Sequence, residues 1–152
     1  MFFKLKIDHT KYDIEQTVAV KSIPALFPDV KNFHRLKDMC RYQMSVFSNS
    51  DLQSLNNAVT RLGIPVNRAI SAEQAGYCKS DSGAYNHAIK ELGMPGARAA
   101  YVADHAWDIR GARPLGMAGA CLYKITLADF DDSQADLEVS GPAGLGDRLT
   151  EL

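Results

Sequence analysis

The chain lacks three features that would each assign it to a class of protein. No apolar run approaches the roughly 20 residues of a membrane span, so we expect no membrane partner. Basic residues are not in excess, since 17 lysines and arginines stand against 18 acidic residues, so we expect no nucleic-acid partner. Cysteine is scarce: Cys40, Cys78 and Cys121 have spacings that suit neither a zinc site nor a disulfide framework. We therefore expect reduced thiols and a cytoplasmic location.

What the chain does have is the length and apolar content of one domain. It has 152 residues, of which 46% are hydrophobic and 23% charged. From residue 28 onward, segments with helical apolar spacing alternate with short apolar runs. We predict helices at 29–42, 51–62, 82–92, 107–115 and 145–152, and strands at 43–48, 69–70, 99–103, 118–123 and 135–139. This alternation predicts an α/β fold, a Rossmann-like three-layer sandwich with a mostly parallel sheet.

The first 27 residues differ from the rest. Phe3, Leu5 and Ile7 alternate with lysines, which is typical of an edge or half-exposed strand. A helix is possible over 12–26, ended by prolines. We therefore expect a single domain, 1–152, in which a divergent N-terminal segment, 1–27, precedes a core, 28–152.

Polar residues follow three of the predicted strands. Ser48 and Asn49 come after the first, Lys79 precedes the helix at 82–92, and Asp104 with Asp108 runs from a strand end into a helix. Open parallel sheets bind ligands at the carboxyl ends of their strands. A hydroxyl and an amide there can hold an anion, a lysine can bind a phosphate, carboxylate or halide substrate, and two carboxylates can orient a lysine, hold magnesium or position a water.

Each of these strand ends also has a purely structural interpretation. Ser50 or Asp51 could cap the helix that follows. Lys79 could be a solvated surface lysine, and Asp104 could cap a helix while Asp108 lies on a polar surface.

Taken together, the order and spacing of the three sites resemble motifs two, three and four of the haloacid dehalogenase superfamily. The type II 2-haloacid dehalogenases are the most similar branch. FSNSD resembles their Ser-Asn-Gly signature, YCKSDSGAY their Tyr-Lys-Pro-Asp segment, and YVADHAWDIRGARPLGM their segment around Ala-Trp-Asp and Gly-Ala-Arg. The resemblance covers about residues 25–152. It implies a core that hydrolyses a carbon–halogen or phosphoester bond of a small anionic substrate.

The resemblance also implies roles for individual residues. Ser48 and Asn49 would contact the substrate's carboxylate or its leaving group. Lys79 would pair with the nucleophilic carboxylate, and Asp108 would be tied to that lysine and to water activation.

Two neighbouring positions depart from the dehalogenase pattern. His105 stands where many relatives carry Asn, and we expect it to help orient the water. Asp104 departs toward the phosphatase branch, where an acid at this point helps hold magnesium. The implied cofactor is therefore none for a dehalogenase, or magnesium if the chain is phosphatase-like.

The largest departure from the family is at the front of the chain. The family's nucleophile is an Asp after the first strand, in a hydrophobic–Asp-x-Asp-x-Thr pattern. The nearest match here runs from Lys6 to Thr10, with Lys6 at the nucleophile position and Asp8 at the second acidic one. Either this is a degenerate first motif with Asp8 as the candidate nucleophile, or the first strand and most of the cap are absent. The sequence favours the second alternative, a truncated core.

A core without its first strand has two consequences. Activity would be reduced or lost, and the chain would then be an inactive remnant that binds a small anion or a partner protein. The exposed sheet would also need cover, so we expect a homodimer in which residues 2–7 or a swapped element fills the gap.

Overall fold

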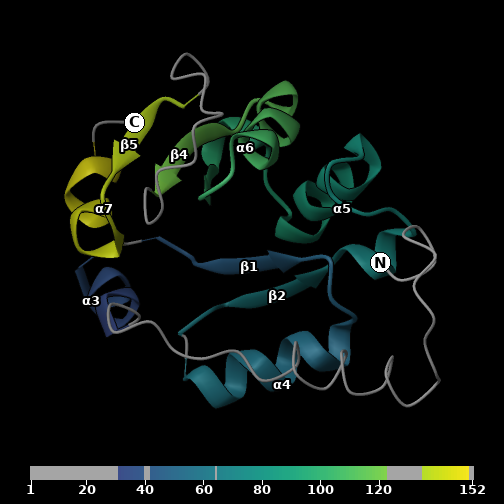
Figure 1. Cartoon of the computed structure of the whole chain (residues 1–152), viewed down its shortest axis with the longest axis horizontal. Coiled ribbons are helices and arrows are strands. Elements are labelled where there is room, and N and C mark those ends of the chain that lie inside the picture. Colours follow the sequence, from purple (N-terminus) through teal and green to yellow (C-terminus); the bar gives the residue numbers. More distant parts are fainter. Residues whose placement is uncertain (1–30, 40–41, 64, 123–134, 151–152) are drawn as a thin grey trace, which may run out of the picture.

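The computed structural model describes residues 31–39, 42–63, 65–122 and 135–150. Its helices are α3 (Lys31–Met39), α4 (Leu52–Leu62), α5 (Ser82–Leu92), α6 (Ala106–Ala112) and α7 (Pro142–Leu149). Its strands are β1 (Ser45–Ser48), β2 (Arg68–Ser71), β3 (Ala100–Ala103), β4 (Ala118–Leu122) and β5 (Leu137–Val139). Three short 3-10 turns complete the described part: η1 (Ala72–Ala75), η2 (Gly96–Arg98) and η3 (Arg113–Leu115). Figure 1 shows this alternation, which confirms the predicted α/β class.

The described strands form two parallel sheets rather than one continuous sheet. β1 pairs with β2, with Ser45 opposite Arg68, and β3, β4 and β5 pair in that order. The strand expected near residues 3–7 and the helix expected over 12–26 lie outside the described residues. Among the strands that the structure describes, β1 and β3 are therefore not paired with each other.

Helices pack on both sheets, and the buried apolar residues form two clusters. α4 packs on β2, α6 on β3 and β4, and α7 on β5, while α3 packs on α7 and α5 on α6 (Figure 1). One buried cluster contains Leu36, Ala120, Leu137, Val139 and Leu145. The other is built from Tyr85, Ala112 and Met117, with Phe47 and Tyr101 packed against it. Tyr85, Phe47 and Tyr101 of this second cluster also belong to the candidate site.

Helix boundaries follow the local signals in the sequence, with two corrections. α5 covers the predicted 82–92 and ends at Gly93, whose φ of 67° suits glycine. The helix predicted at 107–115 is α-helical only to Ala112, because Pro114 has no N–H to continue the ladder. The last helix begins at Pro142 rather than at 145, since proline is well tolerated in a first turn.

Among the residues with assigned structure, no helix has both the length and the apolar character that a bilayer crossing requires.

Candidate active site

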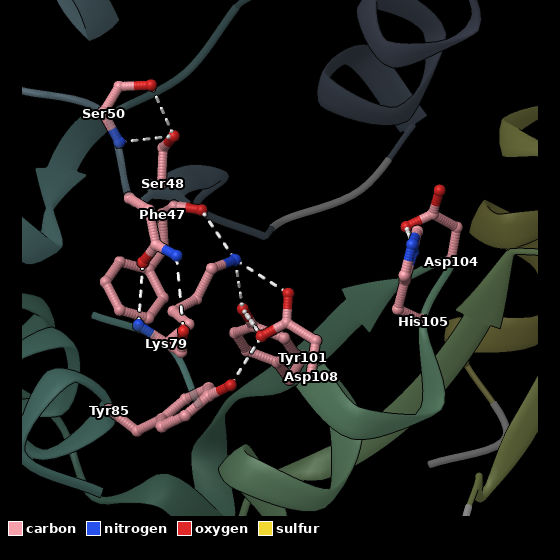
Figure 2. A network of polar contacts seen from close by, with 10 residues as sticks. Phe47, Ser48, Ser50, Lys79, Tyr85, Tyr101, Asp104, His105 and Asp108 are labelled. Atoms are coloured by element: carbon pink, nitrogen blue, oxygen red, sulfur yellow. Dashed lines mark hydrogen bonds and ion pairs between the residues drawn. The ribbon is translucent and has the colours of Figure 1, made fainter. Parts of the chain in front are cut away.

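Lys79 is at the centre of the candidate site. Its side chain is only 12% exposed. Its Nζ donates three hydrogen bonds, to the Phe47 main-chain oxygen at 3.2 Å, the Tyr101 hydroxyl at 3.0 Å and Asp108 Oδ2 at 2.7 Å. These acceptors come from β1, β3 and α6, so one ammonium connects both sheets (Figure 2). The interpretation of Lys79 as a solvated surface lysine is therefore wrong.

Asp108 is the buried counter-ion of Lys79. It lies in the first turn of α6, and its side chain is 10% exposed. Its Oδ1 accepts hydrogen bonds from the hydroxyls of Tyr85 and Tyr101, each at 2.7 Å, while Oδ2 takes the ammonium. A buried ion pair is tolerated when its remaining lone pairs are satisfied, and the two phenols meet that need. The polar-surface interpretation of Asp108 is wrong.

Both tyrosines act as hydrogen-bond donors in this network. Burial, followed by the hydrogen bond to the Asp108 carboxylate, raises the pKa of Tyr85 and of Tyr101 far above the usual value of a phenol. The phenols therefore keep their protons throughout the physiological range. Two hydroxyls thus point permanently at one oxygen of Asp108.

Aromatic rings surround the ammonium. The rings of Phe47, Tyr85 and Tyr101 meet edge to face, with centroids 5.7 to 6.5 Å apart. Lys79 Nζ lies 5.0 Å from the centroid of the Phe47 ring and 5.7 Å from that of Tyr101. Ring faces attract cations and exclude water, so the charge of Lys79 is poorly screened and acts strongly on a nearby anion.

A glycine in α6 makes room for one of these rings. A β-carbon built on Gly111 would overlap the ring and hydroxyl of Tyr85. Only glycine therefore lets Tyr85 approach α6 closely enough to reach Asp108.

Asn49 holds the main chain of Lys79. Its Oδ1 accepts the Lys79 N–H at 2.7 Å, and its Nδ2 donates to the Lys79 carbonyl at 3.3 Å. The Lys79–Ser80 peptide bond is cis, and Asp81 then caps α5 by accepting the Gly83 N–H at 2.7 Å. In this structure the Asn49 amide holds the main chain of Lys79, and the contact with substrate that the family resemblance implies for Asn49 stays a prediction.

Ser48 lies on the same edge, at the end of β1. Its Oγ accepts the Ser50 N–H at 3.1 Å and donates to Ser50 Oγ at 3.0 Å. The capping alternative is confirmed for Asp51, which accepts the Ser54 N–H at 2.8 Å, and these hydrogen bonds lower the pKa of Asp51. Because Asp51 caps α4, the Ser48 hydroxyl does not serve as its N-cap.

Asp104 and Asp108 do not act as a pair. Asp104 Oδ1 lies 2.6 Å from His105 Nδ1, and the two side chains are 65% and 44% exposed. Figure 2 shows Asp104 and His105 apart from Asp108, on the side away from Ser48. The N-cap of α6 is His105, with no side-chain cap bond, so the interpretation of Asp104 as the cap is wrong. Asp8 lies outside the described residues.

The site offers no ready metal centre within the described ranges. No group of three His, Cys, Asp or Glu side chains there is placed to hold a metal ion. Asp108 is committed to Lys79 and two phenols, and Asp104 to His105.

The sequence interpretation missed the two tyrosines. Tyr101 lies in a strand predicted to be buried, and a buried phenol normally needs a hydrogen-bond partner. Tyr85 is fully buried in α5, six residues after Lys79. For Tyr101, the available signal was a polar group inside an apolar strand. For Tyr85 there was none, because nothing in the sequence indicates that Tyr85 packs against Gly111.

Comparisons with known proteins identify the fold and the family. A search of curated proteins found no match. Among solved structures, the L-2-haloacid dehalogenase PA0810 has 22% sequence identity and a TM-score of 0.80, with 97% of this chain and 68% of that one covered. The L-2-haloacid dehalogenase from Xanthobacter autotrophicus with chloropropionic acid covalently bound has 14% identity and a TM-score of 0.84, covering 99% and 71%. The HAD phosphatase from Thermococcus onnurineus has 23% identity and a TM-score of 0.74, covering 97% and 68%.

These similarities establish the fold, and a family model adds the family. The chain spans about two thirds of the length of the solved structures that it resembles, 68% and 67% of two of the L-2-haloacid dehalogenases. The model that describes haloacid dehalogenase-like hydrolases matches residues 3–116. This match begins well before residue 25 and takes in Asp8 as well as Lys79 and Asp108. The chain therefore belongs to the haloacid dehalogenase-like hydrolase family.

Proposed function

We propose that this chain hydrolyses a small 2-haloacid, with Lys79 as the cation that receives the reacting anions. The observation that carries the proposal is the buried Lys79–Asp108 pair at 2.7 Å, which lies beside the ends of β1 and β3. An ammonium fixed among aromatic rings is a preorganised positive charge for a carboxylate or a leaving halide. Ser48, on the same edge, is our candidate for a further contact to the substrate.

Asp8 is our candidate nucleophile. The family match from residue 3 supports it, because the segment before Asp8 then belongs to the matched domain. In the reaction, a carboxylate oxygen of Asp8 attacks the carbon that bears the halogen, so that a C–O bond forms and the halide leaves with the bonding electrons. Water then attacks the ester carbonyl, which releases the 2-hydroxy acid and restores the carboxylate. The covalently bound chloropropionic acid in the Xanthobacter structure is in keeping with such an ester.

Asp108 would act through Lys79 in this scheme. Both of its oxygens already accept hydrogen bonds, two at Oδ1 and one at Oδ2. Its main contribution would be to fix the position of the ammonium. His105, whose Nδ1 is held by Asp104, is our candidate for orienting the water.

A magnesium-dependent phosphatase is the second candidate. Asp104 favours it, as does the similarity to a HAD phosphatase. Magnesium is usually held by one or two carboxylates together with waters and substrate oxygens. The described residues do not fit such a site on their own, because Asp104 is paired with His105 and Asp108 with Lys79. The phosphatase is therefore our second candidate, after the dehalogenase.

We also propose a homodimer. Within the described residues the edges of β1 and β3 have no partner strand, and in this dimer residues 2–7 or a swapped element would pair with them. Sedimentation at micromolar concentration should give twice the monomer mass. A monomer under those conditions would contradict the dimer without affecting the assignment of the active site.

An activity screen tests the proposed function. We expect halide release from L-2-chloropropionate without added metal, and little release of nitrophenol from p-nitrophenyl phosphate even with magnesium. Lys79→Met should lower kcat/KM by about 10²–10³-fold, as is typical for loss of a group that stabilises developing charge. Asp8→Ala should abolish turnover.

Matched variants complete the screen. Asp13→Ala, an acid of the same N-terminal segment, should keep full activity and thereby show that the effect belongs to Asp8. Magnesium-dependent turnover of the phosphate ester, lost in Asp104→Asn, would instead favour the phosphatase. Absence of turnover with both substrates would favour the anion-binding or protein-binding remnant.

A further inference from the structure

The Lys79 ammonium is already saturated with acceptors from the described residues. An ammonium has three N–H donors. In this structure they go to the Phe47 main-chain oxygen, the Tyr101 hydroxyl and Asp108 Oδ2. An incoming substrate carboxylate must therefore replace one of these three acceptors.

The three acceptors differ in how easily they can be replaced. Asp108 carries a full charge and makes the shortest contact, 2.7 Å. The Phe47 oxygen belongs to the main chain of β1 and cannot turn away without moving the strand. The Tyr101 hydroxyl is neutral, lies 3.0 Å from Nζ, and also donates to Asp108 Oδ1 at 2.7 Å. Tyr101 keeps that second hydrogen bond after it releases the lysine.

We propose that Tyr101 is a positioning residue that occupies the anion-facing donor of Lys79 in the ligand-free protein and yields it to the reacting anion. The inference rests on the proposed function, in which Lys79 receives that anion. Between turnovers, the Tyr101 hydroxyl accepts the third hydrogen bond of the Lys79 ammonium, so that no N–H of this ammonium is left unpaired. It also makes anion binding weaker than it would be otherwise, because a hydrogen bond to a charged donor must be broken first.

Tyr85 provides a matched control. Its hydroxyl donates to the same oxygen of Asp108, at the same distance of 2.7 Å, and its pKa is raised for the same reasons. The difference is that only Tyr101 of the two contacts Lys79 Nζ. Tyr85→Phe and Tyr101→Phe therefore remove equivalent support from Asp108, but only the second frees a donor of the ammonium.

Calorimetric titration of the full chain and both variants with acetate and propionate, two unreactive carboxylates, tests the proposal. We expect Tyr101→Phe to bind acetate roughly fivefold or more tightly than the parent chain. Tyr85→Phe should bind it equally or more weakly. In turnover, Tyr101→Phe should lower KM without raising kcat, a split that mere loss of stability would not produce.

A second readout needs no ligand. In ¹⁵N-detected spectra, the Lys79 ammonium protons should exchange faster with water in Tyr101→Phe than in Tyr85→Phe. Equal exchange, or acetate binding by the parent chain that Tyr101→Phe does not tighten, would overturn the inference while leaving the proposed function intact. Failure of the parent chain to bind either carboxylate would overturn both.

Discussion

Asp108→Ala is expected to lower the free energy of unfolding by about 3–5 kcal/mol, the largest single effect that we predict. The substitution leaves the Lys79 ammonium 12% exposed and without its charged partner. It also leaves the buried Tyr85 hydroxyl without its acceptor. Chemical denaturation monitored by fluorescence of Trp107 measures the change.

Two controls separate the loss of the ion pair from the loss of a carboxylate. The double variant Lys79→Met with Asp108→Leu should be more stable than Asp108→Ala while staying inactive, because apolar groups can replace a buried ion pair at little cost. The recovery is partial, because the Tyr85 and Tyr101 hydroxyls still lack their acceptor. Glu91→Ala breaks the exposed ion pair between Arg68 and Glu91, whose side chains are 52% and 42% exposed. This substitution should lower the free energy of unfolding by less than about 1 kcal/mol. A loss in Asp108→Ala no larger than in Glu91→Ala would contradict the buried network.

Gly111→Ala is expected to destabilise the protein by about 1–3 kcal/mol and to lower activity as well. The added methyl group would overlap the Tyr85 ring and hydroxyl, so Tyr85 must move away from α6. That movement breaks the hydrogen bond from Tyr85 to Asp108 Oδ1. Thermal unfolding and the rate of halide release are the two measurements.

Gly144 is the control for this substitution. It lies in α7, and a β-carbon there meets nothing within 4 Å. Gly144→Ala should be neutral or stabilising by up to about 1 kcal/mol, since alanine favours a helix over glycine. If Gly111→Ala were equally harmless, Tyr85 could not be packed against α6 in the way that the structure describes.

Much of the fold could be predicted from local signals. Helical apolar spacing together with Gly93 gave the bounds of α5, and the apolar run at 118–123 gave β4 to within one residue. The division into two sheets among the described strands could not be predicted, because it depends on which strands are neighbours. Local patterns carry little information about that choice.

The candidate site was predictable in its charged members but not in its hydrogen-bond partners. Lys79 and Asp108 stand out in the sequence because each lies close to the expected end of a strand or start of a helix. The spacing of Asp104 and Asp108 was misleading, because side chains four apart share a face only within one helix, and Asp104 precedes the N-cap of α6. Tyr85 and Tyr101 meet Asp108 only through tertiary packing of α5 and β3 against α6.

Transfer of heavy oxygen from water tests the central claim, covalent hydrolysis at a carboxylate beside Lys79, most directly. The full chain is incubated with excess L-2-chloropropionate in H₂¹⁸O, digested, and analysed by mass spectrometry. Because water attacks the ester carbonyl of the enzyme, we predict ¹⁸O in the peptide that contains Asp8, and none in that peptide without substrate. Turnover that labels the 2-hydroxy acid while leaving every peptide unlabelled would contradict a covalent mechanism, and label in a different acidic peptide would contradict the assignment of Asp8.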